Sequence, residues 1–339
     1  MTKKQRIDAF VALGEFLQSG HERIERVIAQ AAVKNPWYTA ANTRKQLSAI
    51  AANLQTDSLE AWLAPYPDAN SSKIVGLILA GNIPLVGFQD ILSVLLAGFH
   101  AAVKVSSDDA GLTTFIRDEL LTIEPAFAEK LSIVDRLKHY DMIIATGSDN
   151  SARYFEHYFG KKPHIIRKNR NSVAILTGTE NEEELRALGN DIFDYFGLGC
   201  RSVSKIYLPK DFPVARFFEA IEPFQTIRDH FKYGNNYDYN KSIYLINGEQ
   251  HFDNGFLLLK KDERLASPLS VLFYEEYNTG EELLNKLHTE ADKIQCLVCQ
   301  APINIKIPVF PLGGSQCPGL TDYADGVDVL AFLFAELDT

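Results

Sequence analysis

KIVGLILAGN, residues 73–82, is a short run rich in Ile, Val and Leu that ends in Gly and Asn. A run of this kind, bounded by a turn signal, is typical of a parallel strand that is buried on both faces. Further along the chain, residues 86–98 and 111–121 are apolar and of helix length, whereas AAVKVSSDD (101–109) and YDMIIATGS (140–148) have the pattern of strands. The alternation of strands with helices predicts an open α/β sheet built from βαβ units.

The segments on either side of this alternation extend the prediction. Residues 5–55 have a helical period, broken at Asn35 and Pro36, with a second helix start capped at Thr39. After the basic segment 161–171 comes a second set of strand patterns: SVAILTG, SVSKIYLP, KSIYLIN, GFLLLKK, PLSVLFY and IQCLVCQ. A helical pattern over 182–196 lies between the first two of them, and the Asn- and Tyr-rich segment 230–241 has no clear period, which favours a loop.

The chain therefore divides into two predicted domains. We expect a cofactor-binding domain over residues 1–166, completed by residues 316–339, and a catalytic domain over residues 167–315. The 339 residues, 46% of them apolar, agree with about two domains that each bury a core.

Composition excludes several classes of protein. The net charge of -10 disfavours binding to nucleic acid or to anionic lipid, which require clustered Lys and Arg. No apolar run reaches the roughly 20 residues of a membrane span, and the N-terminus lacks the pattern of a signal peptide. Four cysteines are too few for a secreted disulfide framework. We expect a cytoplasmic protein with reduced thiols, no membrane span and no nucleic-acid partner.

Cys200 is the first candidate for chemistry. It follows Gly197 and Gly199 at the end of a helical pattern and precedes a strand-like run. The thiol could therefore lie on a turn where the backbone approaches closely, which suits a nucleophile. A buried structural cysteine would fit the pattern equally well.

Polar residues follow two of the predicted strands. Asn82 would lie at the carboxyl end of the sheet, where open α/β sheets bind ligands, and its amide could donate to an oxyanion. A helix cap or a turn residue is the alternative for Asn82. Lys104 and Ser106, after the next strand, are placed to contact a ribose or a phosphate, although an exposed lysine at a strand end is usually only solvated.

Two other patterns carry little chemistry. Cys296 and Cys299 form a CxxC without a second pair of ligands, so burial in a strand is favoured over a metal site. PLGGSQCPGL (311–320) indicates a glycine-rich loop. No GxGxxG follows a strand, so the usual dinucleotide fingerprint is absent.

Taken in chain order, five segments resemble the aldehyde dehydrogenase superfamily and, within it, the long-chain acyl-CoA (fatty acyl) reductases of bacterial bioluminescence. They are GLILAGNIPLVG, LLAGFHAAVKVSSDD, IIATGSDNSARY, FGLGCRSVSKIYLP and PLGGSQCPGL. The resemblance runs from about Lys73 to Gly319. It implies an aldehyde dehydrogenase-like α/β fold with a Rossmann-like cofactor domain and an α/β catalytic domain.

The resemblance also implies roles for individual residues. Cys200 would be the nucleophile that carries the acyl group as a thioester, and Asn82 with the Cys200 backbone N–H would form the oxyanion hole. The superfamily binds its nicotinamide cofactor without the glycine fingerprint. The residues that would contact the cofactor are Lys104, Ser106, Thr146, Gly147, Ser148 and Glu263.

Two departures from the superfamily pattern are informative. Hydrolytic aldehyde dehydrogenases carry a water-activating glutamate about thirty residues before the cysteine, and Arg167 occupies that position here. A cation cannot act as a general base, which favours conversion of an acyl thioester to an aldehyde, and Arg167→Glu is expected to raise hydrolysis. The second departure is near Pro268, where the Glu-x-Phe-Gly-Pro segment is incomplete and Glu263 is the candidate ribose ligand.

We therefore predict an NADPH-dependent acyl-CoA reductase, with NADH as the alternative cofactor and no metal. The donor would be an acyl-CoA or an acylated protein, a partner that activates or transfers acyl groups is compatible with this reading, and we expect a homo-oligomer. The alternatives are a reductase of the same superfamily that uses an acyl phosphate or a short acyl-CoA, an acyltransferase or acyl-carrier module without a cofactor, and an inactive homologue that assembles with such a partner.

Overall fold

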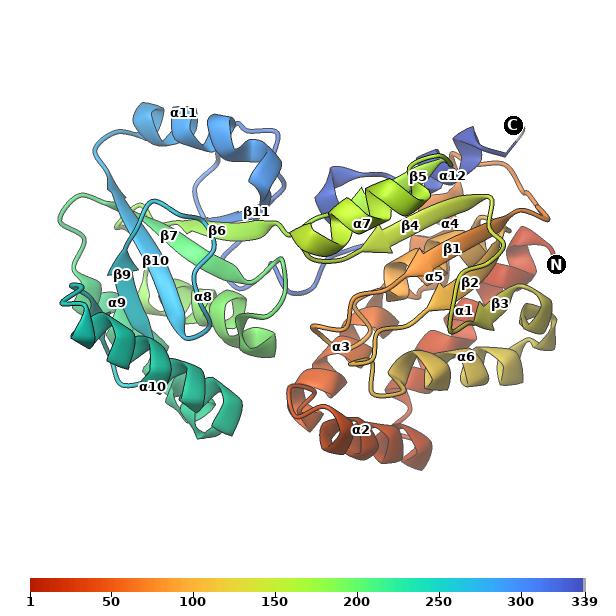
Figure 1. Cartoon of the computed structure of the whole chain (residues 1–339), viewed down its shortest axis with the longest axis horizontal. Coiled ribbons are helices and arrows are strands. Elements are labelled where there is room, and N and C mark those ends of the chain that lie inside the picture. Colours follow the sequence, from red (N-terminus) through yellow and green to blue (C-terminus); the bar gives the residue numbers. More distant parts are fainter. Residues whose placement is uncertain (338–339) are drawn as a thin grey trace. The chain divides into compact units, whose positions relative to one another are not determined.

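The computed structural model describes residues 1–337, which form two compact units (Figure 1). Unit 1 comprises Met1–Asn169 together with Gly319–Thr339, and unit 2 comprises Arg170–Pro318. Each unit is built around its own, mainly parallel β-sheet with helices on both faces.

The sheet of unit 1 has five parallel strands in the order β3-β2-β1-β4-β5. The strands are β1 (Ile74–Ile78), β2 (His100–Lys104), β3 (Leu131–Ile133), β4 (Met142–Thr146) and β5 (His164–Arg167). The chain first builds outward from β1 to β3 and then crosses to β4 on the other side of β1. Such a switch point places a crevice at the carboxyl ends of the central strands, where open α/β sheets bind ligands.

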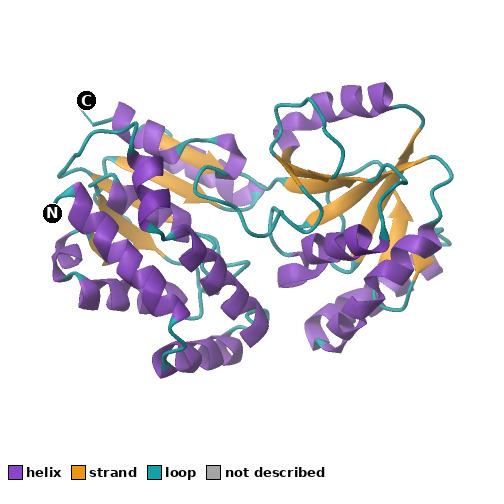
Figure 2. Ribbon diagram, turned by 180° about the vertical axis from the view of Figure 1, so that it is seen from behind, coloured by secondary structure: helices purple, strands orange, loops and turns teal. Residues whose placement is uncertain are grey.

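Helices cover the two faces of this sheet unequally. α1, α5 and α6 lie on one face and α7 lies on the other (Figures 1 and 2), as expected when right-handed crossovers run in opposite directions from β1. Val75 and Leu77 of β1 point into the core with α5. The helices of unit 1 are α1 (Lys3–Gln18), α2 (Glu22–Lys34), α3 (Ala40–Asn53), α4 (Thr56–Leu63), α5 (Phe88–Leu96), α6 (Leu112–Ile123), α7 (Asp149–Phe159) and α12 (Val329–Ala335), with short 3-10 helices at Pro125–Glu129 and Ala324–Gly326.

The C-terminal segment completes unit 1. The indole N–H of Trp62 donates to the Tyr323 hydroxyl at 3.0 Å, and the Tyr66 hydroxyl donates to the Asp328 carboxylate at 2.9 Å. α12 packs against α5. Segments from the two ends of the chain therefore share one core.

Unit 2 contains a seven-stranded sheet in the order β12-β11-β6-β7-β10-β9-β8, parallel except for the pair β8 and β9. Its strands are β6 (Asn171–Ile175), β7 (Val203–Pro209), β8 (Phe252–Asp253), β9 (Leu258–Lys261), β10 (Val271–Tyr277), β11 (Ile294–Cys299) and β12 (Val309–Phe310). Its helices are α8 (Glu182–Phe193), α9 (Val214–Ile221), α10 (Phe231–Ile246) and α11 (Gly280–Glu290), with 3-10 helices at Asp194–Gly197, Glu222–Asp229 and Ala291–Lys293.

Alternation along β6 explains why helices cover both faces of this second sheet. Val173 and Ile175 join the cluster formed with α11, whereas Ala174 joins the cluster formed with α8 and α9. Because successive side chains of a strand point to opposite faces, the consecutive apolar residues of β6 need helices on both faces of the sheet to cover them.

The sequence-based prediction was wrong over residues 230–247, where a loop and then a strand were expected. The structure has one helix, α10, whose buried residues Tyr233, Tyr237, Asn240 and Tyr244 recur every three or four positions. The Tyr233 hydroxyl donates to the Phe256 carbonyl and the Asn240 amide donates to the Leu269 carbonyl. These contacts with distant parts of unit 2 offset the low helix propensity of the Asn, Gly and Tyr residues.

Among residues 1–337, no helix is both long enough and apolar enough to cross a membrane. The same residues contain no cluster of His, Cys, Asp and Glu that could hold a metal ion.

Candidate functional site

In unit 1, the predicted site residues gather at the carboxyl ends of three neighbouring strands. β2, β1 and β4 lie side by side and lead into Lys104, Asn82 and Thr146, respectively. Asn82 and Lys104 are exposed. Gly81 lies so close to Ser106 that an added Cβ would be 2.6 Å from the Ser106 Oγ. The sheet therefore brings residues that are far apart in sequence to one edge.

Tyr38 holds the loop that carries Asn82. Its hydroxyl lies 2.9 Å from the carbonyl oxygen of Gly81 and 3.1 Å from that of Ile83, the two residues that flank Asn82. Burial, reinforced by the nearby Asp109 carboxylate, raises the pKa of Tyr38 well above its ordinary value, so the hydroxyl keeps its proton and remains a donor. Tyr38 fixes the backbone on both sides of Asn82.

The turn after β4 joins the same edge. Ser148 caps α7, because its Oγ accepts from the Ser151 N–H at 3.3 Å. A Cβ at Gly147 would lie 2.8 Å from the Cβ of Ser151, so this position requires glycine. The N-terminus of α7 thus opens at the sheet edge, and helix N-termini attract anionic groups.

These residues fit the polar parts of a dinucleotide. Lys104 supplies an ammonium group, whereas Ser106, Thr146 and Ser148 supply hydroxyls at the edge of three adjacent strands. The Asp109 carboxylate is buried and accepts a hydrogen bond from the Thr113 N–H at 3.1 Å. Its repulsion of a phosphate at this edge is therefore reduced.

In unit 2, Cys200 lies on a tight turn between α8 and β7. The Ser202 N–H donates to the Gly199 carbonyl at 3.0 Å, and the Gly199 N–H donates to the Ser202 Oγ at 3.3 Å. These bonds close the turn around Cys200, which is exposed. The structure therefore presents this thiol to solvent.

The residues just before the turn have an uncommon backbone conformation. Tyr195 and Phe196 have φ values of 53° and 60°, and Gly197 follows with 78°. Left-handed non-glycine residues cost about 1–3 kcal/mol each and cluster at functional sites. Both aromatic side chains are buried, and Phe196 packs on the His230 ring at 4.3 Å between centroids. That packing holds the strained approach to Cys200 in place.

Ser172 stabilises the turn through a hydrogen bond to the backbone of Cys200. Its Oγ donates to the Cys200 carbonyl at 2.9 Å and lies 3.0 Å from the Cys296 sulfur. Cys296 and Cys299 are both buried in β11, as the sequence predicted. Burial raises the pKa of Cys296 to about 11, so this thiol stays protonated at neutral pH.

Asp191 ties the glycine-rich loop to the helix that leads to Cys200. This buried carboxylate on α8 accepts from the N–H groups of Gly313 and Ser315, and from the Ser315 hydroxyl at 2.7 Å. Burial raises the pKa of Asp191, although the hydrogen bonds from Ser315 oppose that shift. The loop and the Cys200 turn thus share α8 as a support.

Glu263 lies on a segment whose backbone is hydrogen-bonded to side chains of β7. The buried Lys205 donates to the Glu263 carbonyl and to the Glu275 carboxylate, both at 2.8 Å. Ser204 donates to the Leu265 carbonyl at 2.8 Å. The Glu263 side chain itself is exposed. Unit 2 therefore links Glu263 to the strand that directly follows Cys200.

Arg167, at the end of β5, forms a buried ion pair inside unit 1. Its guanidinium donates to the two carboxylate oxygens of Asp90 on α5, at 2.7 and 2.9 Å. Both side chains are 7% exposed. Because each of its carboxylate oxygens accepts an N–H from the Arg167 guanidinium, Asp90 is poorly suited to act as a general base, as is Arg167 itself.

The predicted residues thus form two groups: Cys200 and Glu263 in unit 2, and the others in unit 1. Sequence reasoning missed Tyr38, Asp90 and Asp191, which position the site segments. The local signals for these residues were weak. Tyr38 lies in the break between two helical patterns, and Asp90 and Asp191 are acidic residues within apolar helical patterns.

The four thiols should differ in reactivity. At about pH 8 we expect a thiol reagent to modify the exposed Cys200 and Cys317, and to spare Cys296 and Cys299, because the attacking species is an accessible thiolate. Peptide mass spectrometry of folded and denatured protein measures this, with all four thiols reacting after denaturation. Equal rates for Cys296 and Cys317 in the folded protein would contradict the assignment.

Comparison with known proteins places the chain among characterised families. Residues 43–217, just over half of the chain, match the family described as acyl-CoA reductase (LuxC). No curated protein matches the chain. The resemblance inferred from the sequence is confirmed by this match.

Solved structures show the same fold at low sequence identity. Aldehyde dehydrogenase 21 from Physcomitrella patens superposes with a TM-score of 0.72 at 12% identity, covering 99% of this chain and 85% of that one. An indole-3-acetaldehyde dehydrogenase complexed with NAD+ gives 0.73 at 12% identity, with coverages of 98% and 83%. An acetylating aldehyde dehydrogenase from Geobacillus thermoglucosidasius gives 0.67 at 12% identity, with coverages of 96% and 84%. The predicted aldehyde dehydrogenase-like α/β fold is confirmed.

Proposed function

Since the chain belongs to the acyl-CoA reductase (LuxC) family, we propose that it reduces the acyl group of an acyl-CoA, or of another acyl thioester, to an aldehyde through a thioester on Cys200. The exposure of Cys200 on its hydrogen-bonded turn is the observation that supports this residue as the nucleophile. We propose a fatty acyl thioester and NADPH as its substrates.

In the first step the Cys200 thiolate attacks the acyl carbonyl carbon. A carbon–sulfur bond to Cys200 forms while the bond to the thiol of the donor breaks, and the departing thiolate takes up a proton. The closed turn supports this step, because it fixes the backbone of Cys200 while leaving the side chain accessible.

Lys104, Ser106 and the Thr146–Ser148 turn would hold the nicotinamide cofactor, which would supply a hydride when bound. Neighbours of the same fold were solved with NAD+, which supports a nicotinamide cofactor here. With a proton from solvent, the reduced thioester releases the aldehyde and returns Cys200 to the thiol. Glu263 is the proposed ribose ligand from unit 2.

The oxyanion that develops on the acyl carbonyl needs donors. We assign them to the Asn82 side-chain amide and the Cys200 backbone N–H. Tyr38 acts as a positioning residue, because it holds the carbonyls on both sides of Asn82.

Asn82→Ala should lower kcat roughly 100-fold or more, the usual effect of losing one oxyanion donor, with little change in the Kd of the cofactor. Steady-state kinetics and fluorescence titration with NADPH measure the two quantities. Asn82→Asp, of the same size but without the amide donor, is the matched variant and should be impaired as strongly. A collapse of cofactor affinity with normal residual chemistry would assign Asn82 to cofactor binding instead.

Hydrolysis of the thioester should be slow. Arg167 occupies the position at which hydrolytic aldehyde dehydrogenases have the water-activating glutamate, and it forms an ion pair with Asp90. Without a carboxylate base, the acyl-enzyme persists until it is reduced or exchanged with a thiol.

The direct experiment is incubation with acyl-CoAs of graded length plus NADPH or NADH, followed by aldehyde trapping. Aldehyde formed from long-chain donors supports the proposal, and a preference for short chains or acyl phosphates would redefine the donor. Acyl transfer without cofactor consumption would replace the proposal by an acyltransferase.

A further inference from the structure

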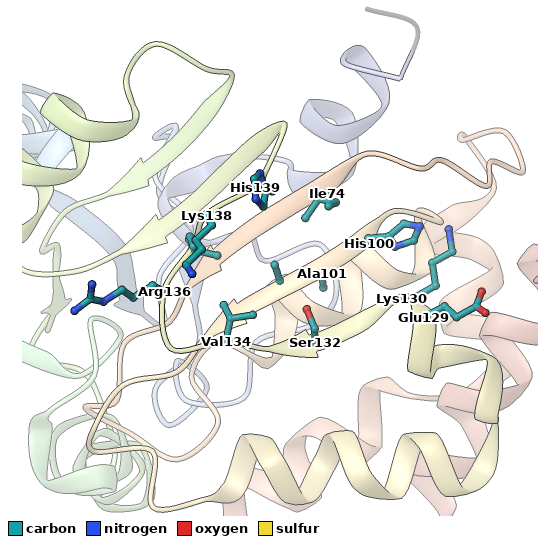
Figure 3. Close-up of a pocket in the computed structure, with 12 residues that line it drawn as sticks. Ile74, His100, Ala101, Glu129, Lys130, Ser132, Val134, Arg136, Lys138 and His139 are labelled. Atoms are coloured by element: carbon teal, nitrogen blue, oxygen red, sulfur yellow. The ribbon is translucent and has the colours of Figure 1, made fainter.

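A cavity of about 350 Å³ lies on the face of the unit 1 sheet that carries α7, over β1, β2 and β3 (Figure 3). A volume of this size falls in the range of small-molecule sites. The lining residues are Ile74, His100, Ala101, Ala102, Glu129, Lys130, Ser132, Val134, Arg136, Leu137, Lys138 and His139.

Strand register explains the floor of the cavity. Gly76, Ala102 and Ser132 are paired across β1, β2 and β3, so they share one face and form a row of small residues, of which Ala102 and Ser132 line the cavity. Ile74 and His100 are paired two positions earlier on the same face. The side chains on this face are mostly small or polar, whereas those at the alternate positions of the same strands point into the apolar core.

The connection that crosses this face is too short to cover it. Residues 134–141 run from β3 to β4 without a helix, although the other crossovers of this sheet each contain one. Leu137 packs onto Gly76, where an added Cβ would lie 3.0 Å from the leucine Cδ1. The Asp141 carboxylate accepts from the Ile74 N–H at 2.8 Å. These two contacts fix the loop over β1 and leave the space above β2 and β3.

The charge of the lining contrasts with that of the chain. It includes Lys130, Arg136 and Lys138 with two histidines, against one carboxylate, Glu129, in a protein of net charge -10. Lys130 and His100 lie at one end of the cavity, and Arg136 and Lys138 extend from the loop at the other (Figure 3). The Lys130 ammonium is fixed by the carbonyls of Ser71 and Gly98, at 2.9 and 3.3 Å. The lining thus suits an anionic ligand.

The cavity is distinct from the proposed cofactor contacts in unit 1. Lys104, Ser106 and the Thr146–Ser148 turn are absent from its lining. Lys104 lies on the same strand face as Ala102, two residues further on, or about 7 Å along the strand. The cavity therefore extends away from the sheet edge toward the amino ends of the strands.

We propose that this cavity binds a phosphorylated adenosine. The floor of small side chains beside Val134 and Leu137 offers a flat, partly apolar surface for a purine ring, and the lysine and arginine side chains offer partners for phosphates. The inference rests on the proposed function, because both proposed reactants carry such a group: coenzyme A has a 3′-phosphoadenosine and NADPH has a 2′-phosphoadenosine.

Isothermal titration calorimetry of the full chain with adenosine 3′,5′-bisphosphate and with adenosine 2′,5′-bisphosphate tests the proposal. Two variants alter the cavity in different ways: Arg136→Glu with Lys138→Glu reverses the charge, and Ala102→Leu fills the floor. Lys210→Glu with Lys293→Glu, both exposed residues of unit 2, gives the same change of net charge as a control. Thermal unfolding checks that each variant folds.

We expect binding that weakens at least tenfold in both cavity variants and is retained in the unit 2 control. Tighter binding of the 3′,5′ compound identifies coenzyme A as the source, and tighter binding of the 2′,5′ compound identifies the cofactor. The proposal is overturned if neither compound binds or if folded cavity variants bind normally.

The test of the cavity can be distinguished from the test of the proposed function. Binding is measured without turnover and should persist in Cys200→Ala. Acylation of Cys200 can be followed with a thioester of N-acetylcysteamine, which lacks the nucleotide. Normal acylation without bisphosphate binding would remove the cavity assignment alone, and binding without acylation would remove the nucleophile alone.

Discussion

Cys200→Ala should abolish both aldehyde formation and covalent labelling by an acyl-CoA, which represents the largest loss of activity expected from any single change. The reason is chemical: alanine has no group that can form the thioester, and no other step of the proposed mechanism replaces it. Aldehyde trapping and intact-protein mass spectrometry measure the two losses.

Cys317→Ala is the matched control, since its thiol is also exposed in unit 2, and Cys296→Ala tests the buried thiol behind the turn. Both should keep most of the activity and labelling. Full activity in Cys200→Ala would remove the whole mechanism, and loss of labelling in Cys317→Ala with normal labelling of Cys200→Ala would move the nucleophile to Cys317.

Breaking the buried pair between Arg167 and Asp90 should produce the largest loss of stability. Removal of one partner leaves an uncompensated buried charge, so Arg167→Met is expected to lower the free energy of unfolding of unit 1 by about 3–5 kcal/mol. Arg167→Glu should be worse, because it places two carboxylates together. We therefore do not expect the gain of hydrolysis predicted from the sequence to be observable in this destabilised variant, and stability is the property to measure.

Urea denaturation followed by tryptophan fluorescence isolates the effect, because both tryptophans, Trp37 and Trp62, lie in unit 1. Arg167→Met combined with Asp90→Leu should recover much of the loss, since an apolar pair carries no buried charge. Arg186→Ala, which breaks an exposed pair with Glu182 in unit 2, should change stability by less than about 1 kcal/mol. A loss that small for Arg167→Met would show that the pair is not buried in solution.

The strands of the central sheets were predictable because their signal is local. Residues 74–80 are apolar at consecutive positions, and burial on both faces of a parallel sheet requires that pattern. α10 could not be recognised in this way, because its helical face consists of tyrosines and one asparagine whose partners lie elsewhere in unit 2. Contacts of that kind override the weak propensities of the segment.

The site was predictable in part for the same reason. Cys200 and Asn82 stand beside glycines or a strand end, and these features are visible in a short window of sequence. Tyr38 and Asp191 act on carbonyls and N–H groups 43 and more than 120 residues away. No local pattern encodes such a pairing, so the structure was needed to find these two residues.

The shared core of the two chain ends has a consequence for biosynthesis. The hydrogen bonds of Tyr323 and Asp328 with Trp62 and Tyr66 can form only after the segment that begins at Gly319 has left the ribosome. Unit 2 is one continuous stretch and can fold on its own contacts as soon as it emerges. Domains usually fold in the order in which they are made. The surface of α5 that α12 covers is therefore completed last, and it stays exposed to chaperones and proteases while unit 2 forms.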